Sequence, residues 1–383
     1  MGDFGGFFNK MIAVSTIIEG VAFLYNESTK HYYKMNDKIF TSFKLGTHTI
    51  KNRIIRSATN DHLGNLDGTV SDAEIEMYDI LAKNDIGTII TGHISVSPDL
   101  GLRADEAQLC IGDDKFIKGL SRIPETIHKY DSLAIAQISM AGPKGLKPFD
   151  FNDLSTEELE EIRDWFIAGA KRAKEAGFDG VQVHIAHWYL LQAIVNIDLN
   201  HRTDKYGGSK ENCLRLPLEI IEGIRKECGK DFIVTVKLNA HNSLQPENDQ
   251  ELLNYYASKL SEAGVDLVEI SGTDFNRKDR KAELYYLEEA KRLKEAHPDI
   301  IISLVGGIFS EETINKALEV TEFASLARTL LTQPDFINKM KAGELLKSRC
   351  IHCNKCFEIF ATKYERCVFG PVIHKLEETF KVN

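Results

Sequence analysis

The sequence has no surplus of basic residues, because its 47 lysines and arginines are outnumbered by 57 aspartates and glutamates. The net charge of −10 argues against nucleic acid as a partner, since binding phosphates needs concentrated lysine and arginine. Long apolar runs are also missing: the segment from Met11 to Tyr25 is interrupted by Glu19 and is too short to span a bilayer. We therefore expect neither nucleic acid nor a membrane as a partner.

Two further absences concern cofactors and compartment. No G-x-G-x-x-G follows a strand pattern, so a nicotinamide would have no Rossmann domain of its own and would share another site. A complete disulfide framework is missing too, because the seven cysteines are an odd set in a chain of 383 residues. This composition fits reduced thiols in the cytoplasm better than a secreted protein.

Apolar runs typical of buried strands alternate with segments of helical periodicity along most of the chain. The strand-like runs lie at 54–59, 86–91, 133–139, 179–185, 232–238, 265–270, 300–305 and 323–327. Segments 115–130, 155–177 and 250–263 are among the helical ones. The alternation predicts an α/β protein with a (β/α)8 TIM barrel, and residues 39–52 predict an N-terminal hairpin cap that turns at Gly46.

We divide the chain into three parts. Residues 1–34 form an N-terminal extension of uncertain order, residues 35–345 the barrel, and residues 346–383 a Cys-rich C-terminal tail. Such cysteine spacing suits a [4Fe–4S] cluster or zinc, and reduced structural thiols are the alternative. The tail has the pattern C-x2-C-x2-C-x10-C, formed by Cys350, Cys353, Cys356 and Cys367.

The stretch from residue 179 to residue 212 carries the strongest chemical signal. Its apolar run ends near His184, and His187 and Tyr189 follow, so three side chains able to donate hydrogen bonds lie close together. The ends of barrel strands are where active sites lie on this scaffold. Zinc is a weaker interpretation of the histidine pair, because no third ligand at helical spacing follows.

The same stretch resembles the old yellow enzyme family of FMN-dependent ene-reductases and NADH:flavin oxidoreductases. Members carry H-x-x-H or H-x-x-N, then G-Y-L, then N-x-R-x-D-x-Y-G-G-S-x-E-N-R. Two positions depart from this pattern, with Trp188 in place of glycine and Cys213 in place of arginine. The matching residues are His184, His187, Tyr189, Leu190, Asn200, Arg202, Asp204, Tyr206, Gly207, Gly208, Ser209, Glu211 and Asn212.

The resemblance implies that FMN binds at the carboxyl ends of the strands. Lys237 would meet the negative charge of the reduced ring, and pairing with Glu269 is the alternative for this lysine among apolar neighbours. Backbone N–H groups near the helix start at Ser310, together with Arg328, would hold the phosphate. The expected FMN-binding residues are Ser57, Ala58, Thr59, Gly92, Gln137, Lys237, Gly306, Gly307, Ala327 and Arg328.

The resemblance also implies that NADH or NADPH reduces the flavin, which then reduces an α,β-unsaturated carbonyl or nitro compound. His184 and His187 would bind the oxygen on which negative charge develops, and Tyr189 would supply the proton. Two alternatives stay open: an NADH oxidase or electron-transfer flavoprotein with a C-terminal iron–sulfur cluster, and a non-redox metal-binding barrel. The acceptor, the choice of nicotinamide and the presence of a homo-oligomer stay open as well.

Overall fold

The computed structural model describes residues 37–274, 281–357 and 367. The chain divides into two compact units, residues 1–37 and Lys38–Asn383. The predicted extension at residues 1–34 lies outside the described residues, as do residues 358–366 and 368–383 of the predicted tail. The barrel and the described part of the tail belong to the second unit.

Eight parallel strands close into a barrel, so the predicted (β/α)8 fold is confirmed. Their order is β4-β3-β11-β10-β9-β8-β7-β6, and pairing of β4 with β6 closes the ring. Each overlaps a run predicted from the sequence, and a short strand, β5 (Ile94–Ser95), pairs in parallel with the carboxyl end of β6. The barrel strands are β3 (Ile54–Arg56), β4 (Thr88–Ile90), β6 (Leu133–Ser139), β7 (Gly180–Ile185), β8 (Ile233–Asn239), β9 (Leu267–Ser271), β10 (Ile302–Val305) and β11 (Phe323–Leu326).

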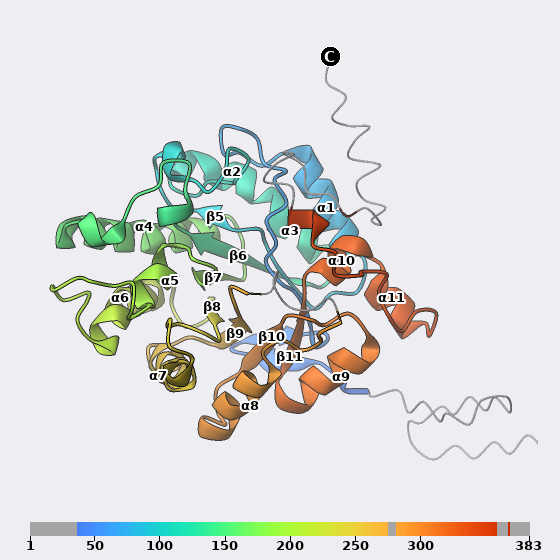
Figure 1. The fold of residues 1–383 in the computed structure, drawn as a ribbon. Helices are drawn as coiled ribbons and strands as arrows, with labels where there is room; N and C mark the ends of the chain where they lie inside the picture. Colours follow the sequence, from blue (N-terminus) through green and yellow to red (C-terminus); the bar gives the residue numbers. More distant parts are fainter. Residues whose placement is uncertain (1–36, 275–280, 358–366, 368–383) are drawn as a thin grey trace, which may run out of the picture. The chain divides into compact units, whose positions relative to one another are not determined.

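Helices surround the strands (Figure 1). At the start of α4, Ser155 and Glu158 form a capping box, in which each side chain accepts a hydrogen bond from the backbone of the other. The segment 115–130, predicted as one helix, is divided into α2 and α3, and Pro124 has no N–H to donate to Leu120. The helices are α1 (Asp72–Ala82), α2 (Ile117–Leu120), α3 (Arg122–His128), α4 (Thr156–Glu175), α5 (Leu190–Val195), α6 (Lys210–Cys228), α7 (Pro246–Glu262), α8 (Leu287–Ala296), α9 (Glu311–Val320), α10 (Arg328–Thr332) and α11 (Phe336–Lys341).

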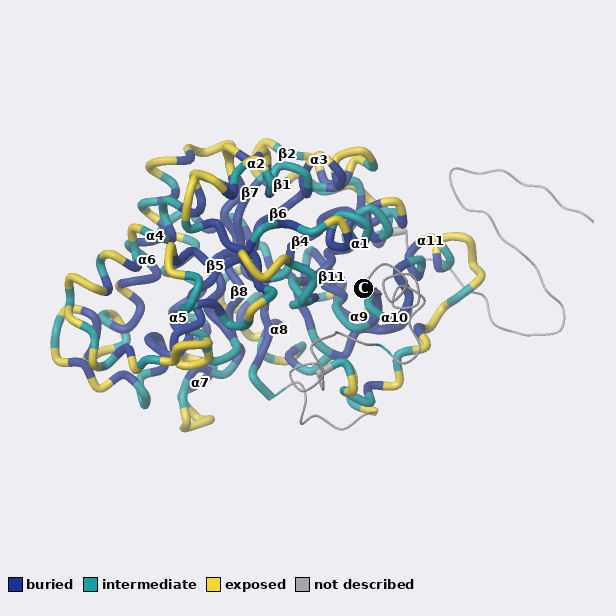
Figure 2. The backbone as a smooth tube through the Cα atoms, turned by 90° about the horizontal axis from the view of Figure 1, so that it is seen from above, coloured by how far each residue is buried: buried dark blue, intermediate teal, exposed yellow. Residues whose placement is uncertain are grey.

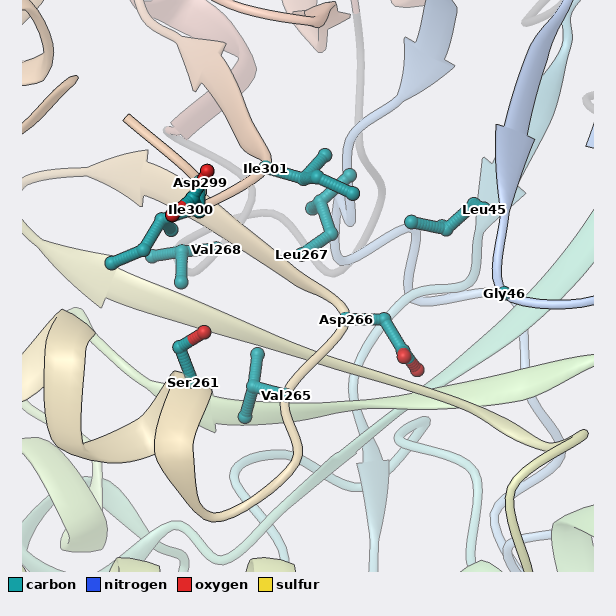
Figure 3. A pocket seen from close by; sticks show the side chains of 10 residues that line it. All are labelled: Leu45, Gly46, Ser261, Val265, Asp266, Leu267, Val268, Asp299, Ile300 and Ile301. Carbon is teal, nitrogen blue, oxygen red and sulfur yellow. The ribbon is translucent and has the colours of Figure 1, made fainter. Parts of the chain in front are cut away.

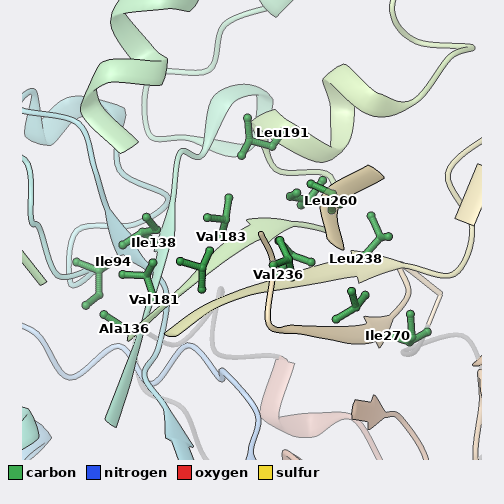
Figure 4. Packing of buried hydrophobic residues seen from close by; sticks show 14 of the residues in the cluster. Ile94, Ala136, Ile138, Val181, Val183, Leu191, Val236, Leu238, Leu260 and Ile270 are labelled. Carbon is green, nitrogen blue, oxygen red and sulfur yellow. The ribbon is translucent and has the colours of Figure 1, made fainter. Parts of the chain in front are cut away.

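The main core lies between the strands and the helices. Figure 4 shows part of it, where Val183 of β7 and Val236 of β8 are fully buried near Leu260 of α7. The strands are almost entirely buried, and exposed residues gather in the outer helices and turns (Figure 2). This burial on both faces lets apolar residues follow one another in β4 and β6, whereas β7, β8 and β9 alternate apolar residues with buried polar ones.

A second, smaller core closes the barrel at the amino ends of its strands. The antiparallel hairpin of β1 (Phe43–Leu45) and β2 (His48–Ile50) turns at Gly46, whose φ of 57° is in the left-handed region that glycine tolerates. Leu45 and Ile50 pack with barrel residues such as Ile135 and Leu267. The predicted hairpin cap is therefore present, and it leaves the carboxyl ends of the strands for a site.

The start of the tail is bound to the barrel. Ser310 and Lys347 form an antiparallel bridge, and the Ser348 N–H donates to the Phe309 carbonyl over 2.8 Å. The first tail cysteines lie beside α10. Among residues 37–274 and 281–357, none of the helices combines the length and apolar character that crossing a bilayer requires.

Candidate active site

A cavity of about 640 Å³ opens where the barrel strands end. Residues from strands far apart in sequence contribute to it, as expected for a site at the carboxyl face of a barrel. Gly92 is not among the residues that line it, and it packs closely on the backbone of Thr59 instead. The predicted site residues that line it are Ser57, Ala58, Thr59, Gln137, His184, His187, Tyr189, Lys237, Gly306, Gly307, Ala327 and Arg328, with Cys356 of the tail.

A smaller hollow of about 200 Å³ lies at the opposite end of the barrel (Figure 3). It is lined by Leu45 and Gly46 of the hairpin and by the amino ends of β9 and β10. Its carboxylate, Asp266, is already bound to Arg225 and accepts the Val234 N–H over 2.8 Å. None of the predicted site residues lines this hollow, so the larger cavity is the candidate active site.

A fully buried polar network forms the floor of the large cavity. Lys237 of β8 donates to Ser57 Oγ over 2.7 Å and lies 3.0 Å from the Glu269 carboxylate on β9. Gln137 donates to Gln182 over 2.7 Å, and Gln182 donates to Glu269 over 3.2 Å. The lysine thus has the pairing with Glu269 that the sequence left as an alternative, and it also faces the cavity, where its role toward a flavin stays a prediction.

His184, His187 and Tyr189 form one ring cluster at the cavity wall. The His184 ring centroid lies 5.1 Å from that of His187 and 5.0 Å from that of Tyr189. Among the described residues, His184 Nδ1 has no hydrogen-bond partner although it is buried. Since buried polar atoms are nearly always paired, this atom is suited to a polar ligand in the cavity.

Burial determines the protonation of this cluster. Loss of water lowers the pKa of His184 and His187 well below its usual range, and the positive charge of Lys237 acts in the same direction. Both imidazoles are therefore neutral at physiological pH and carry one N–H each. Burial, followed by the charge of Asp105, raises the pKa of the Tyr189 phenol, which therefore keeps its proton.

The backbone is strained in the turn formed by His187 and Trp188, just before Tyr189. His187 and Trp188 have φ values of 63° and 67°, in the left-handed region that residues with a Cβ rarely adopt. The Asn239 side chain accepts the His187 N–H over 3.3 Å and helps to hold this turn. Trp188 therefore lies, at the cavity wall, in a backbone conformation suited to the glycine of the family pattern.

The expected phosphate end of the site is partly filled by protein. The segment at Leu284 and Tyr285 packs on Gly306 and Gly307. The Tyr285 N–H donates to the Gly306 carbonyl over 3.1 Å, and the Leu284 N–H donates to the Gly307 carbonyl over 3.2 Å. Arg328 donates to Tyr285 over 3.2 Å and to Asn354 of the tail over 2.6 Å.

The helix start near Ser310 is also in use, since the Glu311 N–H donates to Leu346 and the Thr313 N–H to Ser310. Fewer backbone N–H groups at this helix start are therefore available to a phosphate than the sequence suggested. Gly306, Gly307 and Arg328 still line the cavity, so they stay the predicted phosphate-binding residues.

Comparison with known proteins decides the family. The model of the NADH:flavin oxidoreductase / NADH oxidase family matches residues 38–150 and 145–347. The chain belongs to this family. Membership makes this chain a flavin oxidoreductase and confirms the predicted FMN cofactor, while NADH or NADPH as its reductant stays a prediction.

Related sequences differ in length from this flavin oxidoreductase. An NADH oxidase of Thermoanaerobacter brockii is 30% identical over 368 residues, covering 87% of this chain and 56% of that protein. A 4,4'-dithiodibutanoate disulfide reductase of Rhodococcus erythropolis is 29% identical, covering 86% of this chain and 94% of that one. The chain therefore spans about half the length of one relative and nearly all of the other.

Solved structures show the same fold. A 2-naphthoyl-CoA reductase complex has a TM-score of 0.79 at 23% identity, covering 88% of this chain and 58% of that one. An old yellow enzyme homologue from Zymomonas mobilis has a TM-score of 0.71 at 22% identity, covering 88% and 98%. The barrel and hairpin are thus shared with the old yellow enzymes.

The residues of the large cavity suit FMN. The cavity combines apolar walls with Gln137, Lys237 and Arg328, and with His184 Nδ1, which has no hydrogen-bond partner in the described part of the chain. A flat ring with a polar edge and a phosphate needs this distribution of groups. The alternative of a non-redox metal-binding barrel is not supported: within the described residues, no three His, Cys, Asp or Glu side chains are grouped to hold one ion.

All four tail cysteines line one small cavity beside α10. Arg328 and His352 line this cavity as well as the large one, as does Cys356, so the two adjoin. A single zinc ion would need tight tetrahedral ligands, which the described residues do not form. Binding of a [4Fe–4S] cluster by these cysteines stays a prediction.

Several cavity residues were missed in the sequence, and His93 and Lys144 are two of them. His93 lies just after β4 and lines the cavity, and Lys144 donates to the His187 carbonyl over 2.9 Å. A signal for His93 existed, because it follows the predicted strand end Thr91-Gly92 directly. Lys144 follows the end of β6 in a Gly-Pro-Lys-Gly turn, where no motif indicated a role.

Proposed function

We propose that the protein reduces an activated alkene, an α,β-unsaturated carbonyl or nitro compound, with electrons taken from NADH or NADPH. The observation that carries this proposal is the cluster of His184, His187 and Tyr189 around one cavity that also contains Lys237 and Arg328. FMN, when bound, supplies the hydride. The nicotinamide and the acceptor would use the same open face in turn, since the sequence offers no separate dinucleotide motif.

The histidines bind the acceptor's oxygen. Each is a neutral imidazole with one N–H, and His184 has a buried nitrogen free among the described residues. Hydrogen bonds from such donors stabilise the oxygen most when it gains negative charge, which lowers the barrier of the hydride step. Water exclusion around these buried rings strengthens the effect.

Tyr189 supplies the proton. Its phenol lies beside His184 at the same wall, so a proton released there can reach a carbon of the acceptor whose oxygen the histidines hold. Burial keeps the phenol protonated, which suits a general acid that donates only to a strongly basic carbon. Lys237 provides positive charge at the cavity floor, where the reduced cofactor becomes anionic.

The purified protein tests this function directly. We expect a yellow preparation whose flavin spectrum bleaches under NADH or NADPH without oxygen and returns when 2-cyclohexenone is added. Recovery of colour with formation of cyclohexanone supports the proposal. A colourless protein, or reduced flavin that the enone leaves unoxidised, contradicts it.

A second candidate is electron transfer through the tail. The observation in its favour is that all four cysteines line one cavity adjoining the flavin cavity at Arg328, His352 and Cys356. Cys350, Cys353, Cys356 and Cys367 would hold a [4Fe–4S] cluster, which exchanges single electrons. Iron and acid-labile sulfide near four atoms each per chain support this role, and their absence from protein purified without oxygen contradicts it.

The free state of all seven cysteines supports a reducing compartment, and we propose the cytoplasm.

A further inference from the structure

The phenol of Tyr189 has one hydrogen-bond partner among the described residues, the Nε2 atom of His93, at 3.3 Å. The two ring centroids lie 5.1 Å apart with the planes inclined at 63°. His93 is 8% exposed and lines the same cavity, from just beyond the end of β4. The direction of the phenol hydrogen therefore depends on which His93 nitrogen carries a hydrogen.

The amide of Gln108 determines that tautomer. Its Oε1 accepts the Ala104 backbone N–H over 2.6 Å, which fixes the orientation of the amide, because an N–H cannot donate to an NH2 group. The Gln108 NH2 group then faces His93, donating to its Nδ1 and, over 3.1 Å, to its carbonyl oxygen. An NH2 group only donates, and the Ser139 hydroxyl, 3.4 Å from the same nitrogen, can donate as well, so His93 Nδ1 accepts and the ring hydrogen is on Nε2.

This hydrogen faces the oxygen of Tyr189. If His93 donates from Nε2, the Tyr189 oxygen accepts, and its own hydrogen is free to turn toward the cavity. Burial supports the neutral form, since it lowers the pKa of His93 to about 4. The ionisable groups that act on His93 are Tyr189 and His184 beside its ring, with Asp105 and His62 at longer range.

We propose that His93 is a positioning residue, held by Gln108 as the Nε2–H tautomer, which directs the phenol hydrogen of Tyr189 at the acceptor and stabilises the phenolate left behind. The inference rests on the proposed alkene reduction. In the step, the O–H bond of Tyr189 breaks and a C–H bond forms on the acceptor carbon. The bonding electron pair stays on the phenolate oxygen, and solvent water returns the proton.

Three variants separate this role from simple packing. His93→Phe keeps a ring but removes the donor, and His93→Gln restores an N–H donor. Gln108→Glu keeps the shape but places an acceptor against His93 Nδ1, which draws the hydrogen to that nitrogen. His201→Phe, at an exposed histidine away from the cavity, is the matched control.

The measurements are the two half-reactions of the holoenzyme, followed by stopped flow without oxygen. We expect His93→Phe to lower the limiting rate of reoxidation by 2-cyclohexenone about 10- to 100-fold. Reduction by NADH and half-saturation by the enone should change less than about twofold, and His93→Gln should recover most of the rate. A His93→Phe enzyme with an unchanged reoxidation rate, or with both half-reactions slowed equally, overturns the proposal.

Gln108→Glu adds a pH test. The new carboxylate should raise the pKa of His93 and keep it charged at low pH, when it still donates from Nε2. Above that pKa the remaining hydrogen stays on Nδ1, so the reoxidation rate should fall as pH rises, while the wild-type rate stays level between pH 6 and 8. Equal pH profiles for the two enzymes contradict the assigned tautomer.

Nitrogen-15 histidine spectra of the holoenzyme test the tautomer without turnover. The signal absent from His93→Phe identifies His93, and we expect its Nδ1 to be the unprotonated nitrogen in the wild type. If the wild type fails to reduce the enone, the proposed function fails, and the spectra still decide the hydrogen-bond arrangement. A hydrogen on Nδ1 in the wild type overturns the inference.

Discussion

The ammonium of Lys237 lies 3.0 Å from the carboxylate of Glu269, and both side chains are buried inside the barrel below the cavity. They face each other because β8 and β9 pair in parallel with these two residues in register. An ion pair in this place balances its charge inside the protein while leaving the lysine at the cavity floor. The contribution of this ion pair to stability and its effect on a bound cofactor can be measured separately.

Removing one partner of this pair should destabilise the fold strongly. Glu269→Gln leaves the Lys237 charge without compensation, and the loss in the free energy of unfolding should be about 3–5 kcal/mol. Urea unfolding of the FMN-bound protein measures it. The double variant Lys237→Met with Glu269→Leu should lose less free energy of unfolding than either single variant. A loss in the double variant equal to the sum of the two single losses would contradict the paired arrangement.

Glu269→Gln should also alter the midpoint potential of bound FMN. Without the Glu269 carboxylate, the positive charge of Lys237 acts more fully on the reduced, anionic cofactor, so the midpoint potential should rise. Lys237→Met should lower it. A spectroscopic redox titration of the two variants checks this, and shifts of the same sign in both would show that Lys237 does not face the cofactor.

The histidine pair should govern binding of phenols, which mimic an acceptor oxygen. Changing His184 and His187 together to alanine removes two donors worth about 1 kcal/mol each, so affinity for 4-cresol should fall at least about tenfold. FMN content should be unchanged, and His201→Ala serves as control. Because burial holds the pKa of both imidazoles well below its usual range, wild-type affinity should stay constant between pH 5.5 and 8.

Trp188 offers a test of backbone strain. Its φ of 67° favours glycine, so Trp188→Gly should be more stable than Trp188→Ala by roughly 0.5–1 kcal/mol, although both lose the indole. Both variants should also accept bulkier enones, since Trp188 lines the cavity. Urea unfolding of the pair is the measurement, and an alanine variant of equal or greater stability would contradict the strain.

Arg328 should matter for cofactor retention. Arg328→Ala removes a charge-assisted donor worth about 1.5–3 kcal/mol, so the dissociation constant for FMN should rise about 10- to 100-fold. Arg349→Ala, at an exposed position on the same segment of chain, is the matched control. Because Arg328 also holds Asn354, the variant Asn354→Ala shows how much of the effect comes from the tail. Equal FMN affinity in wild type and Arg328→Ala would remove this residue from the phosphate site.

The barrel could be predicted because its strands are buried on both faces and appear as mostly apolar segments of strand length that alternate with helical patterns. The short helix α5 could not, because all six of its residues are buried and no polar face marks a helical period. The strand ends located nearly half of the residues of the cavity wall in advance. The contacts between these side chains could not be predicted. Lys237 meets Glu269 only through the register of β8 and β9, and His93 meets Gln108 only through the path of a loop.

The account depends most on Tyr189 as the proton donor, and one comparison tests it directly. In Tyr189→Phe, the rate at which NADH reduces the flavin should be within about twofold of the wild type, while the rate at which 2-cyclohexenone reoxidises it should fall about 100-fold or more. Both rates come from stopped-flow absorbance of the flavin without oxygen. Equal slowing of the two half-reactions, or an unchanged reoxidation rate, would contradict the assignment of Tyr189 and the alkene-reducing site built around it.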